Sequence, residues 1–238
     1  MAIDHAMLDL AEATGAHLWR LYRWDPWCLS FGRHEPAARR YDRGRIEGLG
    51  LDCVRRPTGG RAVWHARELT YSVAGPTATL GSLREAYRTI HETLAVAVRS
   101  LCGAAELAPP RATPGLASGA CFAAPVGGEV VVDAKKVVGS AQRRGQAGLL
   151  QHGSMLLEDD QSVVRSVVRG ADSTESAETT LTNLAGRPIE FAEAAAALGA
   201  ALRTVGLRHL ASNEWGEVLD RAPDHYPRYR SDQWTWVR

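Results

Sequence analysis

A long amphipathic helix between two blocks of short strand-like segments is the feature that most constrains the fold of this chain of 238 residues. Apolar residues recur at helical spacing over residues 82–101. Ser82, followed three residues later by Glu85, predicts a capping box at the start of this helix. Strand-like runs precede the helix at 51–56 and 68–75, and further runs follow it. We therefore expect an α+β fold, or a mixed α/β fold, in one piece.

Alternation of apolar and polar residues marks the other strand-like runs. The segments 17–24 and 27–32 are separated by Asp25-Pro26, so we expect them to form a hairpin. Residues 103–127 are rich in Ala, Pro and Gly, and they predict a long irregular loop of the kind that is often functional. Three closely spaced runs then predict a meander of 128–133, 135–144 and 149–158.

Helical spacing elsewhere predicts shorter helices. At the N-terminus, one helix face carries Ile3, Met7, Leu8 and Ala11. Further helices are expected at about 41–49, 161–169, 188–205 and 213–221. We expect all of these elements to form a single domain, 1–238.

The composition excludes several classes of protein. Hydrophobic residues make up 45% and charged residues 23%, which is typical of a folded domain and not of a disordered chain. The formal net charge is +1, so no overall field favours a nucleic acid or a membrane as partner. No segment approaches the ~20 apolar residues of a membrane span, and the N-terminus lacks a signal-peptide pattern. The sequence therefore predicts a cytoplasmic protein with no nucleic-acid or membrane partner.

Four cysteines, Cys28, Cys53, Cys102 and Cys121, form no CxxC pair and have no histidine at zinc-ligand spacing. We therefore predict no metal site and expect reduced thiols. Three of them should fill the core, because free cysteine is often buried. Cys121 differs because it lies in the expected loop, from which its thiolate could reach a cleft as a nucleophile.

Arginines gather at 39–45, at 55–56 and at 143–144. Such runs are most often solvated faces, although they could also dock an acidic protein partner.

The segment RRPTGGRAVWH (55–65) joins two strands through Gly59-Gly60. Adjacent glycines could bring backbone N–H groups close to a ligand, or they could simply form a turn. The segment LLQHGSMLL (149–157) contains His152, which by itself is most often a structural histidine.

The segment DAKKVVGSAQRR (133–144) contains two adjacent lysines. Strand alternation sends Lys135 and Lys136 to opposite faces, so one of them could enter a cleft or apolar interior. A lysine held near apolar surface is a better partner for acyl chemistry. The alternative is an edge-strand lysine that blocks aggregation.

Taken in order, RRPTGGRAVWH…ELTYS, KKVVGSAQRR and LLQHGSMLL resemble the biotin/lipoate A/B protein ligase superfamily, and the resemblance extends over nearly the whole chain. It implies a mixed sheet flanked by helices, related to the catalytic fold of biotin ligases and class II aminoacyl-tRNA synthetases. It also implies that the arginine–glycine motif lines an acyl pocket. The residues to which the resemblance gives a substrate-binding role are Arg56, Thr58, Gly59, Gly60, Arg61, His65, Tyr71, Gly139, Ser140, Ala141, His152 and Gly153.

Two details resemble one branch of the superfamily, the cysteine-dependent octanoyl-[acyl carrier protein]:protein N-octanoyltransferases. These are Gly59-Gly60-Arg61 and Cys121-Phe122. The resemblance implies a catalytic Cys121, and a Lys136 that contacts the acyl carbonyl. It implies octanoyl-acyl carrier protein as donor, a lysine of a lipoyl domain or of the glycine-cleavage H protein as acceptor, and no cofactor.

Two alternatives remain open. A lipoate-protein ligase would use ATP and Mg to make an acyl-adenylate, and a non-catalytic relative would bind the carrier domain as an assembly subunit. The tail SDQWTWVR resembles the stretch after which bipartite ligases continue into an accessory domain. We therefore expect no C-terminal accessory domain, which favours transfer over adenylation.

Overall fold

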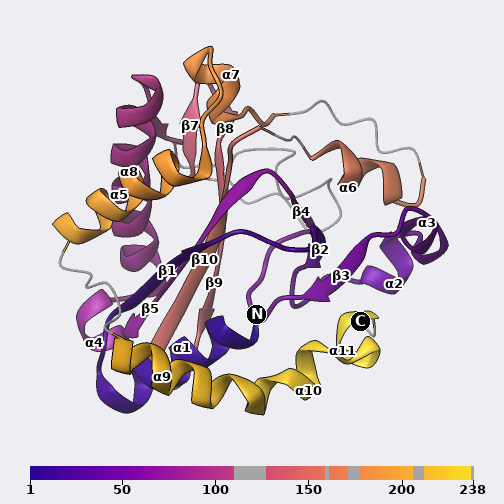
Figure 1. Ribbon diagram of the computed structural model, residues 1–238, viewed down its shortest axis with the longest axis horizontal. Helices are drawn as coiled ribbons and strands as arrows, with labels where there is room; N and C mark the ends of the chain where they lie inside the picture. Colours follow the sequence, from indigo (N-terminus) through magenta and orange to yellow (C-terminus); the bar gives the residue numbers. More distant parts are fainter. Residues whose placement is uncertain (110–126, 159–160, 171–176, 206–211, 237–238) are drawn as a thin grey trace.

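The computed structural model describes residues 1–109, 127–158, 161–170, 177–205 and 212–236. Its largest sheet has the strand order β1-β5-β10-β9, and all neighbours are antiparallel (Figure 1). The strands are β1 (Leu18–Tyr22), β5 (Glu68–Pro76), β10 (Gly148–Leu156) and β9 (Val138–Arg144). We call this the large sheet.

Two smaller sheets accompany it. The second sheet has the order β3-β2-β4, with β2 parallel to β3 and antiparallel to β4. The third sheet, β6-β7-β8, is antiparallel. Their strands are β2 (Cys28–Phe31), β3 (Asp52–Arg55), β4 (Val63–His65), β6 (Glu106–Leu107), β7 (Val130–Val132) and β8 (Lys135–Lys136).

Helices cover both faces of the large sheet. On one face lie α5 (Leu83–Cys102) and α8 (Phe191–Thr204), and on the other lies α1 (Ala2–Thr14) with α9 (Ser212–Arg221) (Figure 1). The shorter helices are α2 (Ala37–Arg40), α3 (Arg43–Gly48), α4 (Thr77–Leu80), α6 (Ser162–Val167), α7 (Leu181–Ala185), η1 (Ala222–His225), α10 (Tyr226–Tyr229) and α11 (Asp232–Trp236). The mixed α/β class predicted from the sequence is confirmed.

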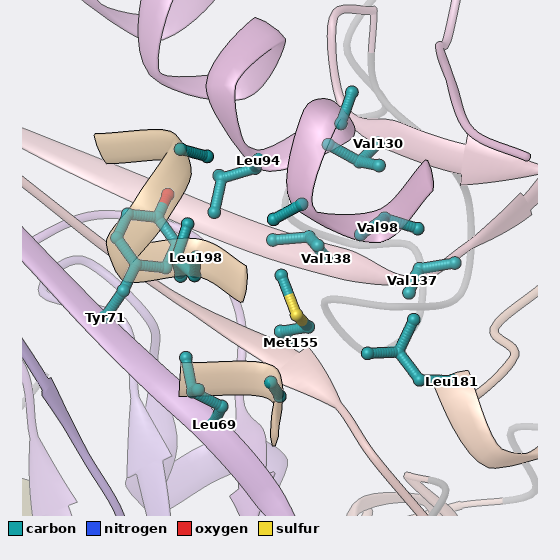
Figure 2. Close-up of a cluster of buried hydrophobic side chains, with 14 of the residues drawn as sticks. Leu69, Tyr71, Leu94, Val98, Val130, Val137, Val138, Met155, Leu181 and Leu198 are labelled. Carbon is teal, nitrogen blue, oxygen red and sulfur yellow. The ribbon is translucent and has the colours of Figure 1, made fainter. Parts of the chain in front are cut away.

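Strand alternation divides the core between these two faces. Tyr71 and Val73 of β5 belong to the cluster that packs against α5 and α8, and Figure 2 shows Tyr71 together with Leu94 and Leu198. Ala74 of β5 instead belongs to the cluster formed with α1. A period-two pattern therefore supplies both layers from one strand.

The helix predicted at 82–101 is confirmed as α5, capping box included. The backbone N–H of Glu85 donates to Ser82 Oγ at 3.3 Å, and the backbone N–H of Ser82 donates to Glu85 Oε2 at 2.8 Å. The helix ends at Gly103, whose φ of 82° is a left-handed conformation that glycine adopts readily. The other expected helices are confirmed as α1, α3, α6, α8 and α9.

Two expectations about strand pairing are wrong. The segments 17–24 and 27–32 form no hairpin, because β1 joins the large sheet and β2 joins the second sheet. The meander is interrupted at Val137, where the chain passes from the third sheet into the large sheet. The predicted turn at Asp133-Ala134 is confirmed, with positive φ values of 49° and 60°. Two such residues form the tight turn that suits a two-residue hairpin.

The packing of α5 gives the first prediction. Leu94 is completely buried between α5 and the large sheet, so Leu94→Ala should lower the free energy of unfolding by about 2–5 kcal/mol. Val96, two residues later on the same helix, is 52% exposed, and Val96→Ala should change it by less than about 0.5 kcal/mol. Urea unfolding of both variants measures the difference, and equal losses would contradict this account of the core.

Candidate active site

A pocket lies between the large sheet and the second sheet, and we call it the inter-sheet pocket. The space between its lining atoms, with the adjoining open solvent included, amounts to about 340 Å³. Seven of the predicted substrate-binding residues line it: Arg56, His65, Gly139, Ser140, Ala141, His152 and Gly153. The other lining residues are Met1, Tyr22, Trp24, Ser30, Val63, Thr70 and Ser154. The motifs at 55–65, 133–144 and 149–157 therefore do meet around one cavity.

Glycine is required where β9 and β10 form the pocket wall. A Cβ at Gly153 would overlap the carbonyl oxygen of Gly139 and would lie 2.6 Å from Ser140 Oγ and 2.8 Å from Tyr71 Cε1. Real Cβ atoms do not approach heavy atoms so closely, so any side chain at position 153 would force the neighbouring atoms of Gly139, Ser140 and Tyr71 to move. Gly153 and its partner Ser140 in the register of the two strands thus fix the shape of the pocket.

The arginine–glycine motif is held together by Arg56. The guanidinium Nη1 donates to Ser30 O and Ser30 Oγ, at 3.1 and 3.0 Å, and Nε donates to Gly59 O at 3.1 Å. Its Nη2 donates to Gly59 O and Arg61 O, at 2.8 and 2.6 Å. Gly60 has a φ of 85°, which completes the turn. Arg56 lines the pocket, whereas Gly59, Gly60 and Arg61 support it from behind.

Arg55, the last residue of β3, is also buried. It donates to backbone carbonyls of Gly32 at 2.6 Å and Glu35 at 2.8 Å, and to the backbone of α11 at Thr235 at 2.9 Å. The pair 55–56 is therefore inside the protein. Both interpretations of these two arginines, a solvated face and a docking surface, are therefore wrong.

His152 is held by a buried carboxylate that the sequence did not single out. Its Nδ1 lies 2.9 Å from Asp4 Oδ2, and its Nε2 lies 2.6 Å from Thr58 Oγ1. Asp4, on α1, also accepts from Arg20 Nη2 at 2.7 Å and from Ser72 Oγ at 2.7 Å. Thr58 therefore does not line the pocket, but positions His152 from outside.

The charges in this network follow from burial and from pairing. Burial alone would raise the pKa of Asp4, but Arg20 and His152 outweigh it and hold the pKa well below its usual range. Burial lowers the pKa of His152, although Asp4 opposes the shift. A neutral His152 that donates from Nδ1 to Asp4 has a free lone pair at Nε2, which accepts the Thr58 hydroxyl.

His65 is paired with a different carboxylate, that of Glu68. Its Nδ1 lies 2.6 Å from Glu68 Oε1, and its Nε2 lies 2.7 Å from Ser30 Oγ. The ring of Trp24 stacks on His65 with 4.4 Å between centroids, and Trp24 Nε1 donates to Thr70 Oγ1 at 3.0 Å. Glu68, Ser30 and Trp24 were not among the residues predicted from the sequence.

Most of the polar groups described around the pocket are thus bonded to one another, although Glu68 Oε2 is buried without a hydrogen-bond partner, and most of the surface that faces the cavity is carbon. Buried polar groups that are paired in this way carry no penalty for an apolar neighbour. The pocket is therefore suited to an aliphatic chain, oriented by a few fixed polar atoms at its wall.

Tyr71 does not line the pocket, although a substrate-binding role was expected. It is fully buried in the core cluster of Figure 2, and its hydroxyl lies 2.6 Å from Ser140 Oγ and 2.8 Å from Gln151 Nε2. Alternation places Tyr71 on the α8 face of β5, beneath the pocket and not within it. It supports Ser140.

Lys136 and Lys135 point to opposite faces, as predicted: Lys135 is exposed and Lys136 is completely buried. The alternative of an edge lysine exposed to solvent is therefore wrong for Lys136. Its Nζ lies 2.6 Å from Glu129 Oε1, and both side chains are buried. Lys136 is not a lining residue of the inter-sheet pocket, but precedes Gly139 of its wall by three residues, about 10 Å along an extended chain.

Cys121 and the surrounding segment 110–126 lie outside the described residues. The three other cysteines are free thiols, with Cys28 buried and Cys53 and Cys102 half-buried. Burial raises the pKa of Cys28, and it raises the pKa of Cys53 to about 12. Neither of these two thiols is activated at neutral pH, which accords with the prediction that they fill the hydrophobic core.

His5, Asp9 and His225 bring three possible metal-ligand atoms within 4.8 Å of one another. His5 Nε2, however, lies 2.7 Å from Arg143 Nη1. Burial, together with the nearby Arg143 and His225, lowers the pKa of His5 to about 3. A guanidinium at a ligand atom opposes cation binding, so these three residues do not fit a metal centre.

The buried carboxylate of Asp4 gives the second prediction. Asp4→Asn should lower the free energy of unfolding at pH 7 by about 3–5 kcal/mol, because Arg20 would remain buried without its charge partner. The folded pKa of Asp4 is depressed, so its stabilisation is complete above the unfolded value of about 3.9 and is lost as the pH falls further. The gap between wild type and variant should therefore narrow in acid.

Urea titrations of both proteins between pH 7 and pH 3 measure this gap. Asp224→Asn, at an exposed aspartate of η1, is the matched control and should leave the free energy of unfolding nearly unchanged. A gap that does not change with pH would contradict the charge assigned to Asp4.

Among the described helices, none is both long and apolar enough to cross a membrane.

Comparison with solved structures shows the same fold. A T. acidophilum protein solved with bound lipoic acid superposes with a TM-score of 0.80 at 19% identity, covering 100% of this chain and 92% of that one. A lipoate-protein ligase A bound with ATP gives 0.76 at 20% identity, covering 98% and 91%. At these identities the likeness concerns the fold.

Sequence relatives are closer. Octanoyltransferase LipM of Kyrpidia tusciae is 37% identical over 99% of this chain and 93% of its own length. Octanoyltransferase LipM of Exiguobacterium sibiricum is 34% identical over 100% of this chain and 94% of its own length. Residues 1–203 match the family described as the lipoyl protein ligase A/B catalytic domain. The resemblance found in the three motifs is thereby confirmed, and this chain belongs to the lipoyl protein ligase A/B catalytic-domain family.

Proposed function

We propose that this chain is an octanoyltransferase of lipoate biosynthesis that carries the acyl group on Cys121. The observation that carries the proposal is the similarity, over nearly the entire chain, to relatives named Octanoyltransferase LipM. The inter-sheet pocket supports it, because its paired polar groups leave a largely carbon surface for an aliphatic acyl chain.

The proposed reaction has two transfers. The Cys121 thiolate attacks the carbonyl carbon of an octanoyl thioester, the C–S bond to the donor breaks, and the donor leaves as a thiol after taking up a proton. The ε-amine of an acceptor lysine then attacks the new thioester, the bond to Cys121 breaks, and the amine loses a proton as the amide forms. Such a covalent relay divides one difficult transfer into two easier steps.

No nucleotide is needed for this sequence of steps. Exchange of one thioester for another is nearly isoenergetic, and formation of an amide from a thioester is downhill. We therefore propose that the enzyme works without a cofactor, and that ATP is required only on the ligase alternative.

The two partners belong to this proposal. The donor would be octanoyl-acyl carrier protein, and the acceptor would be a lysine of a lipoyl domain or of the glycine-cleavage H protein. A cytoplasmic location, where both would be met, and a single domain over 1–238 stay predictions from the sequence.

Each group of the site has a role in the proposed transfer. Lys136 would hydrogen-bond the acyl carbonyl oxygen as negative charge develops on it. Arg56, Gly139, Ser140 and Gly153 would shape the slot for the acyl chain. His65 and His152 would hold the polar wall in one arrangement, each through its own carboxylate.

Intact-mass measurement gives the third prediction. Incubation with octanoyl-acyl carrier protein, in the absence of ATP, should add one octanoyl group to the protein. Cys121→Ser should abolish the adduct and the transfer to a lipoyl domain, because a serine hydroxyl is a much weaker nucleophile near neutral pH.

The same assay separates the alternatives. Activity that survives in Cys121→Ser and requires Mg-ATP would identify a ligase, and binding of the carrier without turnover by either route would identify an assembly subunit. Cys102→Ser, at a half-buried thiol outside the pocket, is the matched control and should keep the adduct.

The pocket wall gives the fourth prediction. Gly153→Ala should lower kcat/KM for octanoyl transfer by at least about tenfold, because the new methyl group would displace Ser140 and Tyr71. Overpacking of this kind should also destabilise the fold by about 1–3 kcal/mol. Gly48→Ala, where a Cβ would meet nothing within 4 Å, should leave both quantities unchanged. Steady-state kinetics together with thermal unfolding measure them, and full activity of Gly153→Ala would exclude this wall from the acyl slot.

A further inference from the structure

We propose that Glu129 is a positioning residue for Lys136, which keeps the amine in its ammonium form and fixes its place. Lys136 would then stabilise the acyl carbonyl oxygen by charge and would not accept a proton during transfer. The proposal rests on the function proposed above, in which Lys136 meets the acyl carbonyl, but part of its test is independent of activity.

The third sheet brings the two side chains together. In the register of β7 and β8, Val131 lies opposite Lys136, so Glu129 is the diagonal neighbour of Lys136 on the same face. Long side chains reach one another across such a diagonal. The turn at Asp133-Ala134 fixes this register, and the result is a distance of 2.6 Å from Nζ to Glu129 Oε1.

The backbone of Lys136 is fixed from its other side as well. Its N–H donates to the carbonyl oxygen of Ala177 at 2.7 Å, and its carbonyl accepts from the N–H of Thr179 at 2.9 Å. Lys136 is therefore bonded within the third sheet and to the segment 177–179. These bonds fix the backbone of Lys136, and burial together with the contact to Glu129 fixes the amine at the end of its side chain.

Burial determines what this pairing does to charge. Lys136 is 0% exposed and Glu129 is 3% exposed. A lone ammonium in such a place would be costly and would tend to lose its proton, whereas a carboxylate in contact favours the charged form. The carboxylate thus selects the ammonium form.

The other ionisable groups around Lys136 do not replace Glu129. Burial lowers the pKa of His91, on α5, to about 3, so His91 is neutral there. Glu178 Oε1 lies 2.8 Å from Arg165 Nη1, so a cation already balances its charge. Lys135 points to solvent. Within the part of the chain that the structure describes, Glu129 is a carboxylate in direct contact with Nζ.

This assignment separates two chemical roles. When the acceptor amine adds to the thioester, the new N–C bond places negative charge on the carbonyl oxygen. An ammonium at Lys136 stabilises that oxyanion by hydrogen bonding and keeps all of its protons. The C–S bond to Cys121 then breaks, and the proton lost by the acceptor amine goes to solvent and not to Nζ.

Glu129→Gln tests the assignment, since glutamine keeps the shape and removes the charge. On the alkaline side of the pH profile, the activity of the variant should decline at a pH at least about one unit lower than that of the wild type. The reason is that the amine of Lys136 would lose its proton more easily. At the optimum, kcat should fall about 10- to 100-fold with KM changed by less than about threefold, since the lost interaction acts on the transition state.

Two variants distinguish positioning from a merely structural role. Lys136→Arg carries a charge that stays at every accessible pH, so in that background Glu129→Gln should no longer move the alkaline limb. Glu35→Gln removes a buried carboxylate that bonds Tyr41 far from Lys136. It should lower stability without moving the pH profile.

A direct titration keeps the test independent of turnover. The ¹³Cε resonance of Lys136, followed by NMR, should titrate at least about one pH unit lower in Glu129→Gln than in wild type. Unchanged titration and an unchanged pH profile would overturn the proposal. Full activity of Lys136→Ala would instead overturn the proposed role of Lys136 in transfer, while the NMR result would still report on Glu129.

Discussion

The buried carboxylate of Asp4 is the contact on which the site depends. It joins α1 to β1 through Arg20, to β5 through Ser72 and to β10 through His152, so one side chain connects a helix to three strands of the large sheet. A charge placed so deep is tolerated because donors surround it on several sides. Since His152 lines the pocket, the position of α1 on the sheet also determines the arrangement of the pocket wall.

The same principle makes a polar wall suitable for an apolar ligand. His65 and His152 each have a carboxylate on one nitrogen and a hydroxyl on the other. These bonds use the polar atoms within the wall and turn carbon towards the cavity. The wall can then bind an aliphatic chain with both histidines paired, Glu68 Oε2 being a buried atom without a partner, and it keeps a defined geometry that a wall of leucines would lack.

Local patterns were sufficient for much of the fold and for the place of the site. The α5 helix with its cap, the opposite orientation of Lys135 and Lys136, and the meeting of three motifs were all predictable, since they depend on periodicity, on turn residues or on motif order. The pairing of β1 with β5 was not predictable from the sequence, because β1 could equally have paired with its neighbour β2. Asp4 and Glu68 were missed because a single acidic residue in an amphipathic segment looks like a solvated one; only tertiary structure surrounds it with donors.

Two buried cations, Arg56 in the pocket wall and Lys136 outside the pocket lining, are held in different ways, and this separates what they can do. The guanidinium of Arg56 makes five hydrogen bonds, to backbone oxygens of the glycine turn and to Ser30, which uses all of its N–H donors. It can shape the pocket, but binding a substrate oxygen would break a bond in the wall. The ammonium of Lys136 is instead in contact with the carboxylate of Glu129, at 2.6 Å, and not with backbone oxygens of the glycine turn. In the proposed function, charge stabilisation would therefore fall to the lysine, whose partner is a carboxylate, while the shape of the pocket depends on the arginine.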